Sequence, residues 1–179
     1  MNSVEKHIAK LRQGIIGQLL LGFMVLAVLG SCKDRQRVVT AEEQLVIDRK
    51  IIEDHLAANS IIAESTPSGL YYQVLRRGNG VKAENGKTVR VHYLGRFLDG
   101  GTFDSSYATG QPYVFRVGAT LDQNSPIRAW HQALLLMHQG DELRIFVPSG
   151  LAYGRMGSFG RIPPNAVLIF DMDLLEVRN

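Results

Sequence analysis

The sequence predicts an α+β fold in which a curled, mainly antiparallel sheet of five to six strands wraps over one short helix, preceded by an N-terminal helix. Two observations predict it. From residue 70 onward, short segments of alternating apolar and polar residues are separated by turns rich in glycine, as in antiparallel sheets. Within this region, one segment at residues 127–137 has helical periodicity instead.

The first 31 residues have the pattern of a secretion signal. Residues 1–13 are polar and basic, and residues 14–29 are apolar but shorter than the roughly 20 residues of a membrane-spanning helix. The run Leu29-Gly30-Ser31-Cys32 resembles a bacterial lipobox, and Cys32 is the one cysteine of the chain. We therefore expect a signal peptide at residues 1–31 and a lipidated Cys32 that attaches the protein to a membrane of the bacterial envelope. An uncleaved N-terminal anchor helix is the alternative.

Residues 32–66 predict a tether followed by an amphipathic helix. Thr40 and Glu43 have the spacing of a capping box, which predicts a helix of about 17 residues ending before Asn59. Its apolar face is formed by Leu45, Ile47, Ile51, Ile52 and Leu56. This face favours packing against the helix's own domain, and a dimerisation or partner-binding arm is the alternative.

Residues 67–179 are predicted to form the main domain, whose start is marked by the turn residues 66–69. Strands are expected at residues 70–75, 89–94, 113–117, 142–147 and 167–177, with a hairpin turn at residues 99–101. The last strand carries Phe170, Met172 and Leu174 on one face, which is expected to be buried.

Composition narrows the class of function. The 45% of hydrophobic and 21% of charged residues are typical of a globular protein. Outside the first 31 residues, 17 basic and 16 acidic residues nearly cancel, which argues against a nucleic-acid binder. A single cysteine excludes an intramolecular disulfide and a zinc cluster of cysteines.

His92 and Asp104 could be combined with a serine into a catalytic triad, but no nucleophile-elbow motif frames Ser105 or Ser106. We expect no metal and no cofactor.

The aromatic residues carry the most specific signal, because they occur within six short motifs. These are Val91-His92-Tyr93-Leu94-Gly95, Asp99-Gly100-Gly101-Thr102-Phe103-Asp104-Ser105-Ser106, Ile127-Arg128-Ala129-Trp130, Leu151-Ala152-Tyr153-Gly154, Ile162-Pro163-Pro164-Asn165-Ala166 and Leu168-Ile169-Phe170-Asp171. Together, and in this order, they resemble the FKBP family of peptidyl-prolyl cis/trans isomerases over about residues 67–179. The helix before residue 67 resembles the leader of bacterial lipoprotein members.

The resemblance implies an aromatic pocket that binds the proline of a polypeptide substrate. It implies substrate-binding roles for the floor residue Trp130, the wall residues Phe103, Tyr113 and Phe170, and the flap residue Ile162. Catalytic roles are implied for the side chains of Tyr93, Asp104 and Tyr153 and for the backbone amide of Ile127. Rapamycin-like macrolides are implied as ligands of the same pocket.

Five departures from the family pattern bear on substrate preference and macrolide affinity. The connection at residues 119–126 is long, and Pro126 stands where an aliphatic residue is common. Ala129 replaces a frequent glycine, Arg161 an apolar flap residue, and Tyr113 a phenylalanine.

The expected function is prolyl isomerisation that assists the folding of exported proteins at the envelope, through desolvation of the X-Pro amide. Two alternatives stay open. One is a non-catalytic chaperone or binding module that uses the same pocket. The other is a structural lipoprotein whose helix at residues 40–58 recruits a partner.

Overall fold

The structure, a computed structural model, describes residues 38–118, 125–158 and 160–179. Residues Val39–Asn179 form one compact unit. The predicted signal peptide and Cys32 lie outside the described residues. No helix in the described part of the chain combines the length and apolar character needed to cross a membrane.

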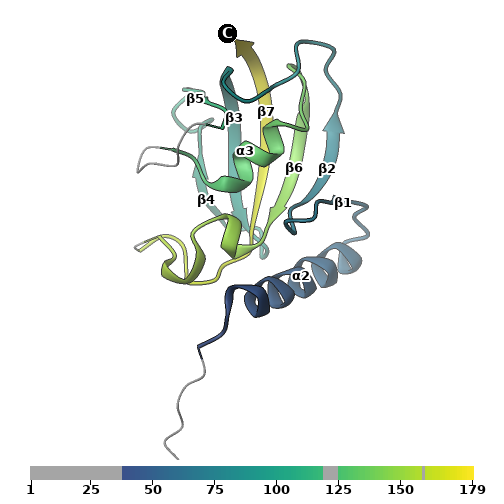
Figure 1. The fold of residues 1–179 in the computed structure, drawn as a ribbon, viewed down its shortest axis with the longest axis vertical. Helices are drawn as coiled ribbons and strands as arrows, with labels where there is room; N and C mark the ends of the chain where they lie inside the picture. Colours follow the sequence, from purple (N-terminus) through teal and green to yellow (C-terminus); the bar gives the residue numbers. More distant parts are fainter. Residues whose placement is uncertain (1–37, 119–124, 159) are drawn as a thin grey trace, which may run out of the picture. The chain divides into compact units, whose positions relative to one another are not determined.

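One antiparallel sheet of seven strands organises this unit (Figure 1). The strand order is β1-β2-β6-β7-β3-β4, and β5 also pairs with β3. The strands are β1 (Glu64–Ser65), β2 (Tyr71–Arg76), β3 (Thr88–Phe97), β4 (Thr102–Ser105), β5 (Tyr113–Arg116), β6 (Glu142–Val147) and β7 (Leu168–Arg178). The predicted α+β fold is confirmed. The two-residue β1 adds a strand that is too short to produce an alternating pattern in the sequence.

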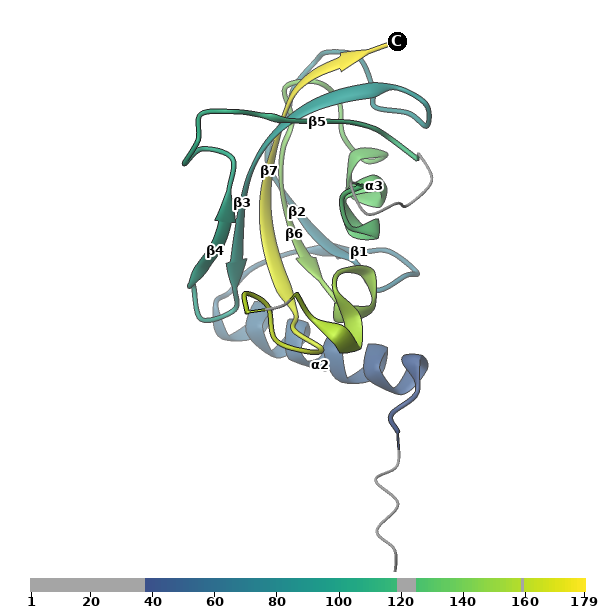
Figure 2. The ribbon, with the colours of Figure 1, turned by 90° about the vertical axis from the view of Figure 1, so that its left-hand side faces the viewer.

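The sheet curves around the short helix α3 (Arg128–Leu134), and the main core lies between them (Figure 2). β7 contributes Phe170, Met172 and Leu174 to this core, as predicted, and none is more than 2% exposed. α3 is shorter than the predicted segment 127–137. It ends early because the amides of Leu136 and Met137 bond to carbonyls three residues back, which tightens the chain into turns. Met137 is nevertheless fully buried.

A second, smaller core lies on the opposite face of β6 and β7, under helix α2 (Ala41–Ala58). Ile52 and Leu56 of α2 pack there with Phe146 and Ile169. Neighbouring residues of the same strands, such as Phe170, face the main core. Both faces of these strands are therefore covered, which explains the continuous apolar run at residues 167–170.

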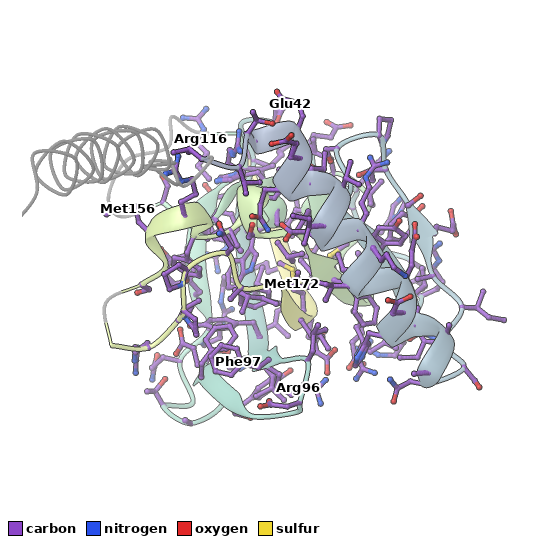
Figure 3. The ribbon with its side chains drawn as sticks, turned by 90° about the horizontal axis from the view of Figure 1, so that it is seen from below. Glu42, Arg96, Phe97, Arg116, Met156 and Met172 are labelled. Atoms are coloured by element: carbon purple, nitrogen blue, oxygen red, sulfur yellow. The ribbon has the colours of Figure 1, made fainter. Side chains whose placement is uncertain are left out.

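Helix α2 begins with the predicted capping box. The Thr40 hydroxyl accepts from the Glu43 amide at 3.1 Å, and the Glu43 carboxylate accepts from the Thr40 amide at 3.0 Å. The apolar face differs from the prediction, because Ile47 and Ile51 are 44% and 39% exposed. The buried side is instead narrower and includes a carboxylate, Asp48. Figure 3 views α2 from below, with Glu42 of its first turn at the surface.

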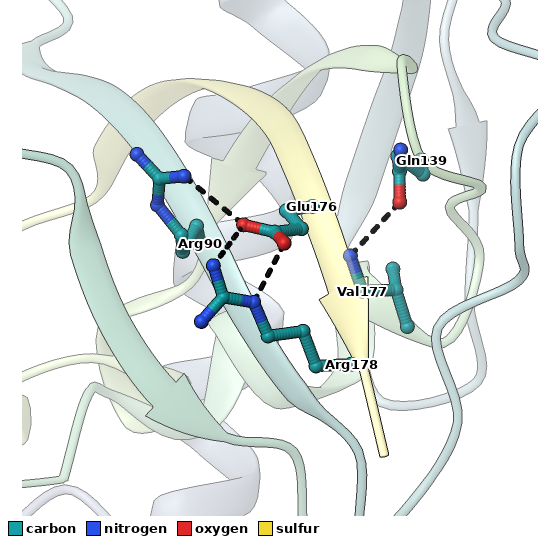
Figure 4. A network of polar contacts seen from close by, with 5 residues as sticks. All are labelled: Arg90, Gln139, Glu176, Val177 and Arg178. Atoms are coloured by element: carbon teal, nitrogen blue, oxygen red, sulfur yellow. Dashed lines mark hydrogen bonds and ion pairs between the residues drawn. The ribbon is translucent and has the colours of Figure 1, made fainter.

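An exposed polar network joins β3 to the end of β7, where the chain terminates (Figure 4). Glu176 accepts from Arg90 at 3.0 Å and from Arg178 at 2.6 Å. These two hydrogen bonds lower the pKa of Glu176 to about 2, and the bond from Arg178 has the larger effect. The Gln139 side chain accepts from the Val177 amide at 3.1 Å. Because the ion pairs are solvent-exposed, we expect them to fix local geometry more than overall stability.

Candidate functional site

A pocket of about 270 Å³ opens between the curved sheet and the start of α3. This volume is close to the lower end of ligand pockets, roughly 300 Å³, and suits one small ring with its flanking amide. Its walls come from β3, β4, β5, β7, α3 and two connecting segments. It is lined by Tyr93, Asp104, Tyr113, Ser125, Pro126, Ile127, Trp130, Tyr153 and Phe170.

Trp130 is the centre of the aromatic cluster around this pocket. Its ring lies 4.6 Å from that of Tyr93, 5.5 Å from Phe170 and 5.9 Å from Tyr113, all edge-to-face. Edge-to-face contacts are a preferred arrangement of aromatic pairs, so they hold these rings in a defined geometry. Trp130 is 5% exposed and Phe170 2%, and both belong to the main core, so the bottom of the pocket is formed by buried aromatic rings.

Gly95 on β3 allows one wall to form. It pairs with Phe170 on β7 and with Asp104 on β4, which brings both residues to the pocket. A Cβ at Gly95 would lie 2.7 Å from the ring of Phe103 and 3.0 Å from that of Phe170. Because such distances are too short for carbon contacts, only glycine lets these two rings meet edge-to-face across β3 at 5.5 Å.

The polar groups of the pocket are concentrated at Tyr93 and Asp104. The Tyr93 hydroxyl donates to Asp104 Oδ2 at 2.8 Å, and Asp104 Oδ1 accepts from the Ser105 amide at 2.9 Å. Burial, followed by this bond to Asp104, raises the pKa of Tyr93. The phenol therefore keeps its proton at neutral pH, and the carboxylate is held toward the pocket by two donors.

Two further hydrogen-bond donors lie at the rim. Ile127 is the N-cap residue of α3, and no hydrogen bond among the described residues uses its backbone N–H. Tyr153 precedes the 3-10 turn η2 (Gly154–Met156) and is 37% exposed. Burial, followed by the charge of Asp104, raises the pKa of Tyr153, against a smaller lowering by Arg161. Its phenol is therefore also a proton donor at neutral pH.

The structure brings seven of the nine residues implied at the sequence level into one pocket. Phe103 and Ile162 are not among the lining residues. Phe103 instead packs behind the wall, between Phe97 and Phe170. Ile162 is turned into the core, is 7% exposed, and lines a neighbouring hollow with Arg161. The roles assigned to these side chains stay predictions.

Sequence reasoning missed two lining residues, Ser125 and Pro126. They lie at the end of the long connection that we noted as a departure from the family pattern. The sequence feature that could have predicted them is the position of Pro126, directly before the implied amide donor Ile127. His131 of α3 is buried, and its Nδ1 accepts a hydrogen bond from the Gly118 amide at 2.9 Å. Among the described residues, no three potential metal ligands cluster.

The family described as FKBP-type peptidyl-prolyl cis-trans isomerase matches residues 79–175, which include every residue lining the pocket. The chain belongs to this family. The FKBP-type isomerase FkpA of Aeromonas hydrophila is 42% identical over 139 residues, which cover 76% of this chain. The match spans about half, 49%, of that relative's own length.

Two further comparisons extend over nearly the whole chain. The macrophage infectivity potentiator of Trypanosoma cruzi is 34% identical over 178 residues, covering 98% of this chain and 86% of that protein. The crystal structure of FkpA from Escherichia coli is similar with a TM-score of 0.64 and 26% identity, covering 99% of this chain and 83% of that one. The FKBP assignment from the six motifs is therefore confirmed.

Proposed function

We propose that this FKBP-type isomerase catalyses rotation about X-Pro bonds in exported proteins at the bacterial envelope, and that it acts by desolvating the amide. The observation that carries the proposal is the pocket itself. It joins an aromatic floor at Trp130 to two protonated phenols and to the backbone amide of Ile127, which no hydrogen bond among the described residues uses.

Desolvation lowers the barrier because of the electronic structure of the amide. A planar X-Pro amide is stabilised by resonance, and losing that resonance gives a barrier of about 18–20 kcal/mol. The twisted amide is less dipolar, so moving it from water into an apolar pocket costs less than moving the planar form. A hundred-thousandfold acceleration requires a difference of about 7 kcal/mol between the two.

Hydrogen bonds at the rim complete the mechanism. In this mechanism the backbone amide of Ile127 donates to the carbonyl of the residue before proline. Tyr153 is a second donor for the substrate backbone, since its phenol is half-exposed and protonated. Tyr93 and Asp104 form the polar edge of the pocket and orient the amide as it turns. These groups bind the substrate and orient the one amide bond that rotates.

The envelope location is supported by the leader sequence. A basic segment, an apolar segment and the run Leu29-Gly30-Ser31-Cys32 are arranged as in a lipoprotein precursor. We expect Cys32→Ser to block acylation and to leave the precursor uncut, as measured by mass spectrometry and radiolabelled fatty acid. Normal maturation of that variant would contradict a lipid anchor.

The activity is tested with a proline-containing tetrapeptide and the chain from residue 33, which contains the whole compact unit. We expect cis/trans exchange well above the spontaneous rate, competed by a rapamycin-like macrolide. Binding of the peptide with exchange at the spontaneous rate would instead support the alternative of a non-catalytic chaperone that uses the same pocket.

A further inference from the structure

A buried carboxylate connects helix α2 to the segment that carries Tyr153. Asp48 is 1% exposed and lies one turn before Ile52 on the inward side of α2. Its Oδ1 accepts from the Gln44 side chain at 2.7 Å. Its Oδ2 accepts from both the amide and the hydroxyl of Ser149, at 2.7 and 2.6 Å. A carboxylate at a core-facing position is costly unless its oxygens are bonded, and here three donors satisfy them.

Ser149 begins the short 3-10 turn η1 (Ser149–Leu151), four residues before Tyr153. Ser149 is itself 1% exposed, and its carbonyl accepts from the Ala152 amide at 2.9 Å. The next residue of the turn, Gly150, accepts from the side chain of Arg128 on α3. The turn is therefore held from two sides, by α2 through Asp48 and by α3 through Arg128.

We propose that Asp48 is a positioning residue for the pocket, which acts through Ser149 and η1 on the placement of Tyr153. Helix α2 lies before the region matched by the family, residues 79–175. The helix is then part of the catalytic unit and not only a spacer that separates it from the membrane. The kinetic readout of this inference rests on the proposed isomerase activity.

The consequence for catalysis follows from what Tyr153 does. If its phenol holds the substrate backbone in both the ground state and the transition state, losing its placement weakens binding of both equally. Such a change raises KM and leaves kcat nearly unchanged. We expect a rise of about tenfold in KM, smaller than the roughly hundredfold that a 1 Å misplacement of a reacting group can cost.

The test compares Asp48→Ala with Asp54→Ala in the full chain. Asp54 lies on the same helix but is exposed, and pairs with Lys50 at the surface. We expect Asp48→Ala to raise KM for a proline tetrapeptide and to speed hydrogen exchange at the amides of Ser149, Leu151 and Ala152. Exchange in β6 and β7 should stay slow in both variants. Asp48→Asn should have a KM close to that of the unmodified protein, because an amide oxygen can still accept both bonds from Ser149.

Three outcomes would overturn the proposal. They are a KM for Asp48→Ala equal to that of Asp54→Ala, unchanged exchange in η1, or faster exchange spread evenly through the sheet. If Asp48→Ala does not fold, Ser149→Ala replaces it, since it removes the hydroxyl bond and keeps the amide bond. Ser149→Ala should raise both KM and the rate of hydrogen exchange in η1. If neither quantity changes, the proposal is overturned. Absence of isomerase activity in the unmodified chain would overturn the proposed function, and η1 exchange would still decide whether Asp48 holds the turn.

Discussion

The hydroxyl of Tyr93 and the carboxylate of Asp104 are joined by a 2.8 Å hydrogen bond across neighbouring strands at the edge of the pocket. Tyr93 also contacts the Trp130 ring at 4.6 Å, so the same residue belongs to both the polar and the aromatic part of the site. The bond fixes the phenol and the carboxylate relative to each other at the wall of the pocket. The Tyr93 ring packs against the main core, so we expect the Tyr93 hydroxyl and the Asp104 carboxylate, and not the ring, to contribute to turnover.

We expect Tyr93→Phe and Asp104→Ala each to lower kcat/KM by about tenfold, which corresponds to about 1.4 kcal/mol in the transition state. Circular dichroism and urea unfolding should show a folded protein in each case. Tyr72→Phe is the matched control, because Tyr72 donates a similar bond of 2.6 Å to Glu64 on the surface. Kinetics like those of the control would remove Tyr93 and Asp104 from the site.

The fold and the pocket differ in how far the sequence determines them. Alternation along β3 and β7 and the capping box of α2 are local patterns, so they predict strands and a helix start directly. The pocket residues come from six motifs far apart in the chain, and only the family resemblance placed them together. The inward face of α2 was predicted wrongly at Ile47 and Ile51, because periodicity gives a face but not how wide the contact with the sheet is. Asp48 was overlooked for a related reason, since its partner Ser149 is about a hundred residues away.

Trp130 should separate stability from binding. Trp130→Ala is expected to lower the free energy of unfolding by about 3–5 kcal/mol, because it removes a large buried ring from the core. Trp130→Phe keeps an aromatic ring at the floor of the pocket. Its free energy of unfolding should be close to that of the unmodified protein, while its affinity for a proline peptide should be lower. Urea unfolding and isothermal titration calorimetry measure the two effects. A Trp130→Phe variant that loses stability as Trp130→Ala does, with unchanged peptide affinity, would show that Trp130 is a core residue alone.

His131 should make stability depend on pH. Burial lowers its pKa in the folded state, and Nδ1 must be unprotonated to accept from the Gly118 amide. The unfolded chain, with a histidine pKa of about 6.5, then binds more protons than the folded chain as pH falls below that value. The free energy of unfolding should therefore be greatest above about pH 6.5 and decrease as the pH falls below it.

Replacing His131 by glutamine should flatten this decrease, since glutamine can accept the same bond without titrating. His138→Gln is the control, because His138 is 44% exposed in its side chain. Urea unfolding at several pH values measures the effect. An equally steep decrease in both variants would assign it to other groups.

Arg161 should bias the choice of substrate. It is exposed beside Ile162, makes no ion pair with any acidic residue in the described part of the chain, and its charge lowers the pKa of the Tyr153 phenol at the pocket rim. An exposed pairing with an acidic side chain next to the proline would contribute roughly 0.2–1 kcal/mol, so Glu-Pro peptides should have a kcat/KM up to about fivefold above Lys-Pro peptides. Arg161→Ala should remove this ratio, as should high salt, because screening weakens exposed charge pairs. Arg178→Ala should keep the ratio, because Arg178 is the last residue of β7 and Phe170, which lines the pocket, is near the first. An unchanged ratio in Arg161→Ala would mean that another group determines the preference for the residue beside proline.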